Sequence, residues 1–161
     1  MRWMWIDKIE SLESGKKACA LKNCSLAEEH VHDHFPGFPT HPASLIIEGM
    51  AQTAGILVGE ARHFEEKVIL AKISKAKFYT EAHPGDQLRF YAEIVSVDEA
   101  FGRTEGKVYK SIDGNKQAEL LAEIDLMFSH IDQNTSGIKF PEENFVFTDQ
   151  FAQLLRSVDV Q

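Results

Sequence analysis

The alternation of apolar and polar residues predicts a chain built mostly of β-strands. Two runs, at residues 3–12 and 16–24, flank the turn Glu13-Ser14-Gly15 and predict a hairpin. The remaining strand-like runs are residues 68–80, 88–94, 101–112 and 119–128. Turn residues separate them at 83–86 and at Asp113-Gly114-Asn115. Because the apolar side chains of each run fall on one face, we expect an antiparallel sheet with one buried face.

One long helix interrupts this pattern. It is predicted to begin at Pro42, because proline suits the first helical turn, and no further proline occurs before residue 84. Apolar side chains occupy almost every face of this segment, so we expect the helix to be buried on most sides. Glycines at 49, 55 and 59 indicate close approach to a sheet or another helix. The prediction is an α+β fold in which the sheet curls around the helix.

Composition limits the class of protein. The 161 residues, 43% hydrophobic and 26% charged, are typical of one globular domain. The net charge of −8 disfavours a nucleic-acid partner. Residues 45–59 are the most apolar stretch, but they are too short and too polar to span a bilayer, so we expect no membrane insertion. Cys19 and Cys24 form no disulfide framework and predict a cytoplasmic protein with reduced thiols.

Three neighbouring features could carry chemistry. His34 lies in a proline-rich loop, Asp-His-Phe-Pro-Gly-Phe-Pro. Glu48 is the only charged residue between positions 45 and 59, and Gln52 lies one turn further on the same helix face. A carboxylic acid in an apolar setting suits a general acid. The helix start, Pro42-Ala43-Ser44, presents unpaired N–H groups that could stabilise an oxyanion.

The segment H-F-P-G-F-P-T-H-P-A-S-L-I-I-E-G-M-A-Q, residues 34–52, resembles the active-site segment of the 3-hydroxyacyl-acyl carrier protein dehydratases (FabZ/FabA-like), which have the hot-dog fold. In that family an acidic residue follows the histidine by fourteen positions, as Glu48 follows His34, and Ala-Gln comes next. The Gly15-Lys16 turn, I-S-K-A-K-F and the Pro-Gly-Asp-Gln-Leu turn at 84–88 extend the resemblance to residues 3–130. We therefore expect a hot-dog domain at 1–130 and a C-terminal extension at 131–161 with a short helix from Thr148.

The resemblance also implies an activity. His34 would remove the α-proton of a 3-hydroxyacyl thioester, and Glu48 would protonate the departing 3-hydroxyl or orient a water molecule. The backbone N–H of Ala43 would polarise the thioester carbonyl, and Ser44, Gln52 and Gly37 would complete the substrate site. The expected product is a trans-2-enoyl thioester, formed without a metal or an organic cofactor. An acyl carrier protein would deliver the substrate to a homodimer or a trimer of dimers, because in this family each site combines His and Glu of different subunits.

Two residues depart from the family pattern. Asp33 precedes the histidine where glycine is usual, and Ala43 stands where the helix start usually has glycine. An alanine cannot adopt glycine-only backbone angles, so Ala43 bears on rate and substrate size. Lys72, Lys75, Lys77 and Arg62 are candidates for a basic carrier-docking patch.

Three rival hypotheses remain open. A metal site could use His30, His32 and His34, which would share one side of an extended strand, with Asp33 and His41 nearby. A hot-dog thioesterase would use its acidic residue to activate water. A non-catalytic acyl-thioester binding module would account for the alanine at position 43.

Overall fold

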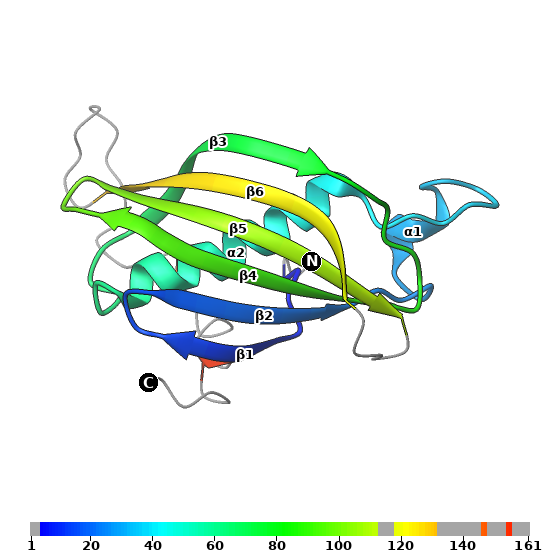
Figure 1. The fold of residues 1–161 in the computed structure, drawn as a ribbon, viewed down its shortest axis with the longest axis horizontal. Helices are drawn as coiled ribbons and strands as arrows, with labels where there is room; N and C mark the ends of the chain where they lie inside the picture. Colours follow the sequence, from blue (N-terminus) through cyan, green and yellow to red (C-terminus); the bar gives the residue numbers. More distant parts are fainter. Residues whose placement is uncertain (1–3, 113–117, 132–145, 148–153, 156–161) are drawn as a thin grey trace.

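The structure is a computed structural model that describes residues 4–112, 118–131, 146–147 and 154–155 (Figure 1). Within these residues a six-stranded sheet has the order β1-β2-β4-β5-β6-β3, and every neighbouring pair is antiparallel. The strands are β1 Lys8–Glu13, β2 Lys17–Asn23, β3 Val68–Phe78, β4 Asp86–Val97, β5 Phe101–Ile112 and β6 Glu119–His130. The helices are α1 Glu29–His32 and α2 Ala43–Glu60. The predicted hairpin, long strands and long helix are confirmed.

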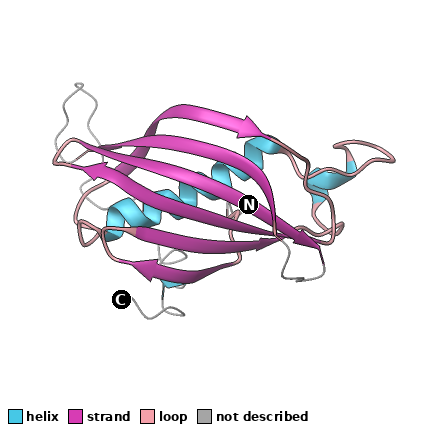
Figure 2. Ribbon diagram, viewed as in Figure 1, coloured by secondary structure: helices cyan, strands magenta, loops and turns pink. Residues whose placement is uncertain are grey.

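The sheet curves around α2, so the helix forms the centre of the core (Figure 2). Apolar residues of α2, including Met50, Ala54 and Leu57, are completely buried against strand residues such as Phe90 and Ile124. A helix with apolar residues on most faces can be stable in water only if other elements cover those faces. The predicted hot-dog arrangement is therefore confirmed.

Two of the helix glycines allow the close packing that the sequence predicts. A Cβ at Gly49 would lie 2.7 Å from Cζ of Phe90 in β4, and a Cβ at Gly59 would overlap the ring of Phe147. At Gly55 a Cβ would meet Cε1 of Phe128 at 3.5 Å, an ordinary contact. Glycine at positions 49 and 59 is less favourable for the helix than alanine would be, but it allows close contact with these aromatic rings.

Strand β3 forms one edge of the sheet and is exposed along most of its length. Residues 70–77 are all exposed, including Leu70 at 39% and Ile73 at 46% of their full surface. Its inner neighbour β6 pairs with it from Val68↔His130 to Phe78↔Ala122. An exposed edge strand with apolar side chains is suited to pairing with another strand.

Some sequence predictions differ from the structure or lie outside its described part. A single helical turn, α1, forms directly before the proline-rich loop of His34, where the sequence predicts no helix. The hairpin turn at 113–115 lies outside the described residues. Of the short helix expected from Thr148, only Leu154 and Leu155 are described, and both are helical. The division into domains at residue 130 stays a prediction. Among the described residues, no helix is long and apolar enough to cross a membrane.

Candidate active site

A tight turn shapes the loop that carries His34. Phe35 N–H donates to Phe38 O at 3.0 Å, and Phe38 N–H donates to Phe35 O at 2.9 Å. Pro36 fits the second position of such a turn, and Gly37 takes the left-handed angle φ +77° that the third position needs. Among the residues that the structure describes, no heavy atom lies within 4 Å of where a Gly37 Cβ would be. Gly37 is therefore needed for its backbone angle rather than for space.

His34 is held in one orientation by Thr40. Its Nδ1 lies 3.1 Å from the Thr40 carbonyl oxygen, and Thr40 N–H donates to His34 O at 2.8 Å. A carbonyl can only accept, so Nδ1 carries the hydrogen and the neutral ring keeps a lone pair on Nε2. The ring also stacks on Phe35 at a centroid distance of 4.2 Å. The half-buried imidazole is thus prepared to accept a proton at Nε2.

The start of α2 follows this loop directly. Ala43 and Ser44 are exposed, and Pro42 occupies the N-cap position. Pro42 O accepts from the N–H groups of Leu45 and Ile46, at 3.0 and 3.1 Å. Within the described part of the chain, the N–H groups of Ala43 and Ser44 have no acceptor. Ala43 lies in ordinary helical conformation, so alanine fits here without strain and its N–H remains available.

A chain of hydrogen bonds positions the carboxylate of Glu48. Gln52 Nε2 donates to Glu48 Oε1 at 2.9 Å, and the backbone N–H of Trp5 donates to Gln52 Oε1 at 2.9 Å. Gln52 is buried, whereas Glu48 is half-buried and so less enclosed than its position in the sequence suggests. The predicted pairing of Glu48 with Gln52 on one helix face is confirmed. Trp5 has no sequence signal for this role, because it lies 47 residues from Gln52.

Glu48 opens into an apolar cavity of about 240 Å³ beside α2. Its walls come from α2, from the edge strand β3, from β6 and from two residues of the C-terminal segment. The lining residues are Glu48, Ala51, Gln52, Gly55, Ile56, Val68, Ile69, Leu70, Phe128, Val146 and Phe147. Glu48 and Gln52 supply the polar side chains among these lining residues, and the other walls are apolar. The cavity therefore suits a hydrocarbon chain with one reactive end.

One chain does not assemble the whole predicted site. His34 and Gly37 lie in the loop before α2, and Ala43 and Ser44 lie at its start, but none of these four residues lines the cavity that contains Glu48 and Gln52. The cavity wall includes Leu70 on the exposed edge strand β3. His34 and Glu48 therefore lie in different parts of the surface of one chain.

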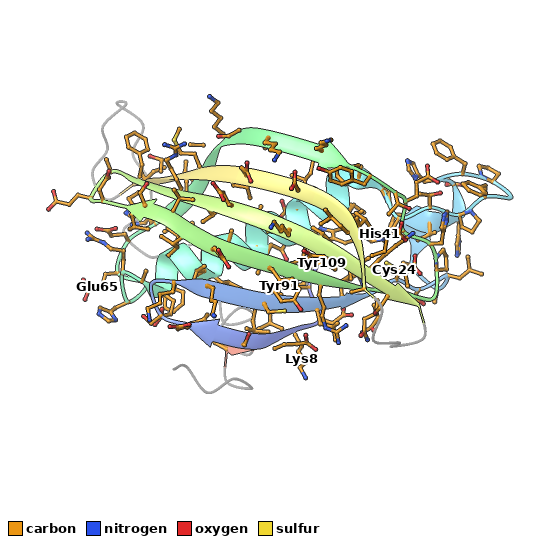
Figure 3. All side chains as sticks on the ribbon, in the orientation of Figure 1. Lys8, Cys24, His41, Glu65, Tyr91 and Tyr109 are labelled. Carbon is orange, nitrogen blue, oxygen red and sulfur yellow. The ribbon has the colours of Figure 1, made fainter. Side chains whose placement is uncertain are left out.

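Two further histidines form a pair behind the His34 loop. His30 Nε2 and His41 Nδ1 are 3.2 Å apart, and both rings pack edge-on against Trp5, at 5.1 and 6.4 Å. Figure 3 shows His41 at the end of the sheet next to α1. His41 is 2% exposed, and burial lowers its pKa to about 4; burial also lowers the pKa of His30. At neutral pH both rings are uncharged, and one donates a hydrogen bond to the other.

The structure contradicts the arrangement proposed for the metal-site hypothesis. His30, His32 and His34 do not share one side of a strand, because α1 forms there. His32 Nε2 lies 2.9 Å from Leu26 O, and His34 is bound to Thr40. Another group, Glu28, His30 and His41, has ligand atoms within 4.8 Å of one another.

That group already holds a cation. The Lys22 ammonium lies 2.6 Å from Glu28 Oε1, and its side chain is only 7% exposed. A metal ion would have to displace this ammonium from the carboxylate, so the arrangement favours the ion pair. The expectation that no metal binds stays a prediction, which metal analysis of the purified protein checks.

Two of the four candidates for the basic docking patch, Arg62 and Lys75, are paired with carboxylates. Arg62 Nε donates to Glu66 Oε2 at 3.1 Å, and Lys75 Nζ lies 2.8 Å from Glu123 Oε2. The Lys77 ammonium lies over the ring of Tyr79 at 4.5 Å. Arg62 is the least suited to a partner, because both its Nε and its Nη2 donate to the Glu66 carboxylate.

Comparisons with known proteins find a matching family and several curated relatives of this chain. Residues 2–119 match the family described as FabA-like domain. The 3-hydroxyacyl-[acyl-carrier-protein] dehydratase FabZ of Pelotomaculum thermopropionicum is 38% identical over 128 residues, covering 79% of this chain and 87% of that protein. FabZ of Ruminiclostridium cellulolyticum is 40% identical over 118 residues, covering 73% and 82%.

Solved structures share the fold. A conserved protein from Pseudomonas aeruginosa has a TM-score of 0.60 to this chain at 16% identity, covering 77% of this chain and 87% of that one. At that identity the likeness concerns the fold alone.

Proposed function

Because the chain belongs to the FabA-like family of 3-hydroxyacyl-acyl carrier protein dehydratases, we propose that it removes water from a 3-hydroxyacyl thioester to give the trans-2-enoyl thioester. The observation that carries this proposal is the hydrogen bond that sets the orientation and tautomer of the His34 ring. Thr40 holds the hydrogen on Nδ1 and leaves Nε2 free to act as a base.

In the first step His34 Nε2 takes the α-proton of the substrate, and the electron pair of that C–H bond moves toward the thioester carbonyl. The N–H groups of Ala43 and Ser44, which have no acceptor among the described residues, would stabilise the negative charge on the carbonyl oxygen. One such donor is typically worth about 3 to 4 kcal/mol. The positive end of the α2 dipole adds to this effect.

In the second step the C3–O bond breaks and the hydroxyl leaves. Glu48 donates its proton to that oxygen, so the products are water and the enoyl thioester. His34 then holds one proton more and Glu48 one fewer, and the enzyme is restored when a proton passes from one to the other. Gln52 keeps the Glu48 carboxyl group turned toward the cavity through its hydrogen bond.

The active form proposed here is a homodimer in which His34 of one subunit works with Glu48 of the other. Support comes from the separation of His34 from the Glu48 cavity in one chain, and from the exposed edge strand β3, which carries part of that cavity's wall. Pairing of two β3 edges about a two-fold axis would cover Leu70 and Ile73 and extend the sheet. Sedimentation of the purified protein measures the assembly, and a monomer with full activity would contradict the shared site.

The acyl group is proposed to arrive on an acyl carrier protein in the cytoplasm. The cysteines support the choice of compartment, because Cys19 and Cys24 are buried and form no disulfide. Burial raises their pKa values to about 11 and about 12, so neither is a reactive thiolate at neutral pH. Comparison of kcat/KM for the same acyl group on a carrier protein and on coenzyme A tests the choice of carrier.

Product analysis tests the reaction itself. The purified protein is incubated with a 3-hydroxyacyl thioester, and the enoyl thioester and free thiol are measured separately. Formation of enoyl thioester supports the dehydratase. Free thiol without enoyl product would instead indicate a thioesterase, and binding without turnover would indicate a binding module; either result would overturn the proposal.

A further inference from the structure

We propose that Phe147 closes the far end of the apolar cavity and thereby limits the length of the acyl chain that the enzyme accepts. This inference rests on the function proposed above. Phe147 lies beyond residues 2–119, the part of the chain that matches the FabA-like family. The limit would therefore be a property that the C-terminal extension adds to this chain.

The cavity has a polar end and an apolar end along α2. Its helix residues, at positions 48, 51, 52, 55 and 56, form a single stripe with helical spacing. Glu48 and Gln52 give the polar end, and Gly55 and Ile56 continue it toward the C-terminus of the helix. At a rise of 1.5 Å per residue, Glu48 and Gly55 are separated by about 10 Å along the axis. An acyl chain with its C3 at Glu48 would extend in this direction.

The ring of Phe147 is fixed at the apolar end. It lies on Gly59, one turn beyond Gly55, where a Cβ would come within 2.7 Å of its Cε2. It also packs edge-on against Phe64, with ring centroids 4.8 Å apart and planes at 67°. Gly59 is about 16 Å from Glu48 along the helix axis. Phe147 and its neighbour Val146 line the cavity, so a longer acyl chain must displace them.

A substitution at Gly55 is expected to shorten the preferred acyl chain instead of lengthening it. It lines the cavity between Glu48 and Phe147, and a Cβ there would make only ordinary contact with Phe128 at 3.5 Å. Alanine at this position should fit the fold while placing a methyl group at the cavity wall. Phe147→Ala and Gly55→Ala are therefore expected to shift the preferred chain length in opposite directions.

The test measures kcat/KM for a series of straight-chain 3-hydroxyacyl thioesters of increasing length. Phe147→Ala should raise the ratio of the longest to the shortest substrate by about tenfold, the scale of one methylene in an apolar pocket. Gly55→Ala should lower the same ratio. Phe101→Ala is the matched control, because Phe101 is 45% exposed and does not line the cavity, and its profile should equal that of the wild type.

The outcomes separate this proposal from the proposed function. An unchanged length profile in active Phe147→Ala protein would overturn the role of Phe147 and leave the dehydratase function standing. If the wild type dehydrates no substrate of any length, the function fails, and this proposal fails with it. Circular dichroism checks folding; should Phe147→Ala not fold, Phe147→Leu decides, with a smaller shift toward longer substrates expected and an unchanged profile refuting the proposal.

Discussion

Acidification should destabilise this protein through the buried histidine pair. His41 has an ordinary pKa near 6.5, which its burial lowers to about 4 in the folded state. The unfolded chain therefore binds more protons than the folded chain between these two values. Stability is fully present above pH 6.5 and falls as the pH drops from 6.5 toward 4. The difference between the two pKa values corresponds to about 3 kcal/mol from His41, and the lowered pKa of His30 adds to the loss in the same direction.

The groups around the histidine pair explain why the pKa of His41 is lowered rather than raised. Burial opposes a charge on His41 most strongly, the neighbouring His30 and Lys22 oppose it further, and Glu28 favours it only in part. Once protonated, the two rings could no longer share a hydrogen bond at 3.2 Å, since both nitrogens would be donors. Acid should therefore loosen the contact with Trp5, whose N–H positions Gln52.

Urea unfolding between pH 4.5 and 7.5, followed by circular dichroism, measures this effect. The variant His41→Phe keeps an apolar ring but cannot titrate, so its free energy of unfolding should fall less with acidity than that of the wild type, by about 2 to 3 kcal/mol over the range. His32→Gln, at an exposed position, is the control and should follow the wild type. Equal losses in wild type and His41→Phe would refute the reasoning.

Three further predictions concern packing and catalysis. Gly49→Ala should lower the free energy of unfolding by about 1 to 3 kcal/mol, because its Cβ would meet the buried ring of Phe90 at 2.7 Å, whereas Gly55→Ala should be neutral or slightly stabilising; urea unfolding compares them, and equal effects would contradict the packing. Gln52→Leu should lower the free energy of unfolding by about 1 to 3 kcal/mol, since the Trp5 N–H loses its acceptor. It should also lower kcat by about tenfold more than it changes KM, and an unchanged kcat would show that Gln52 does not position Glu48. His34→Ala and Glu48→Gln should each lower kcat by about 10²- to 10⁴-fold while substrate binding persists, and near wild-type turnover in either would refute its role.

The sequence predicts the strands and the long helix well because each of these elements buries one face or most of its surface. The alternation in residues 88–94 is a direct consequence of that burial: Leu88, Phe90 and Ala92 are completely buried in β4. The start of α2 is predicted at Pro42, and the helix begins one residue later, at Ala43, with Pro42 as its N-cap. The loop around α1 shows no such periodicity, and a four-residue helix is too short to produce one.

Motif spacing predicts the residues of the candidate site but not the contacts that support them. His34, Glu48 and Gln52 are recognisable because they lie within nineteen residues of one motif. The contacts of Trp5 with Gln52 and of His30 with His41 depend on how β1, α1 and α2 pack, which local pattern does not encode. The position of β3 at the sheet edge, beside β6, is likewise a long-range result of folding.

The most direct test of the central claim mixes two inactive variants, His34→Ala and Glu48→Gln, under conditions that let subunits exchange. If each site combines His34 of one subunit with Glu48 of the other, half of the dimers become mixed, and one of their two sites is intact. Dehydration of a 3-hydroxyacyl thioester should then recover to about a quarter of the wild-type rate. A mixture that stays as inactive as the separate variants would contradict a dehydratase site shared between subunits.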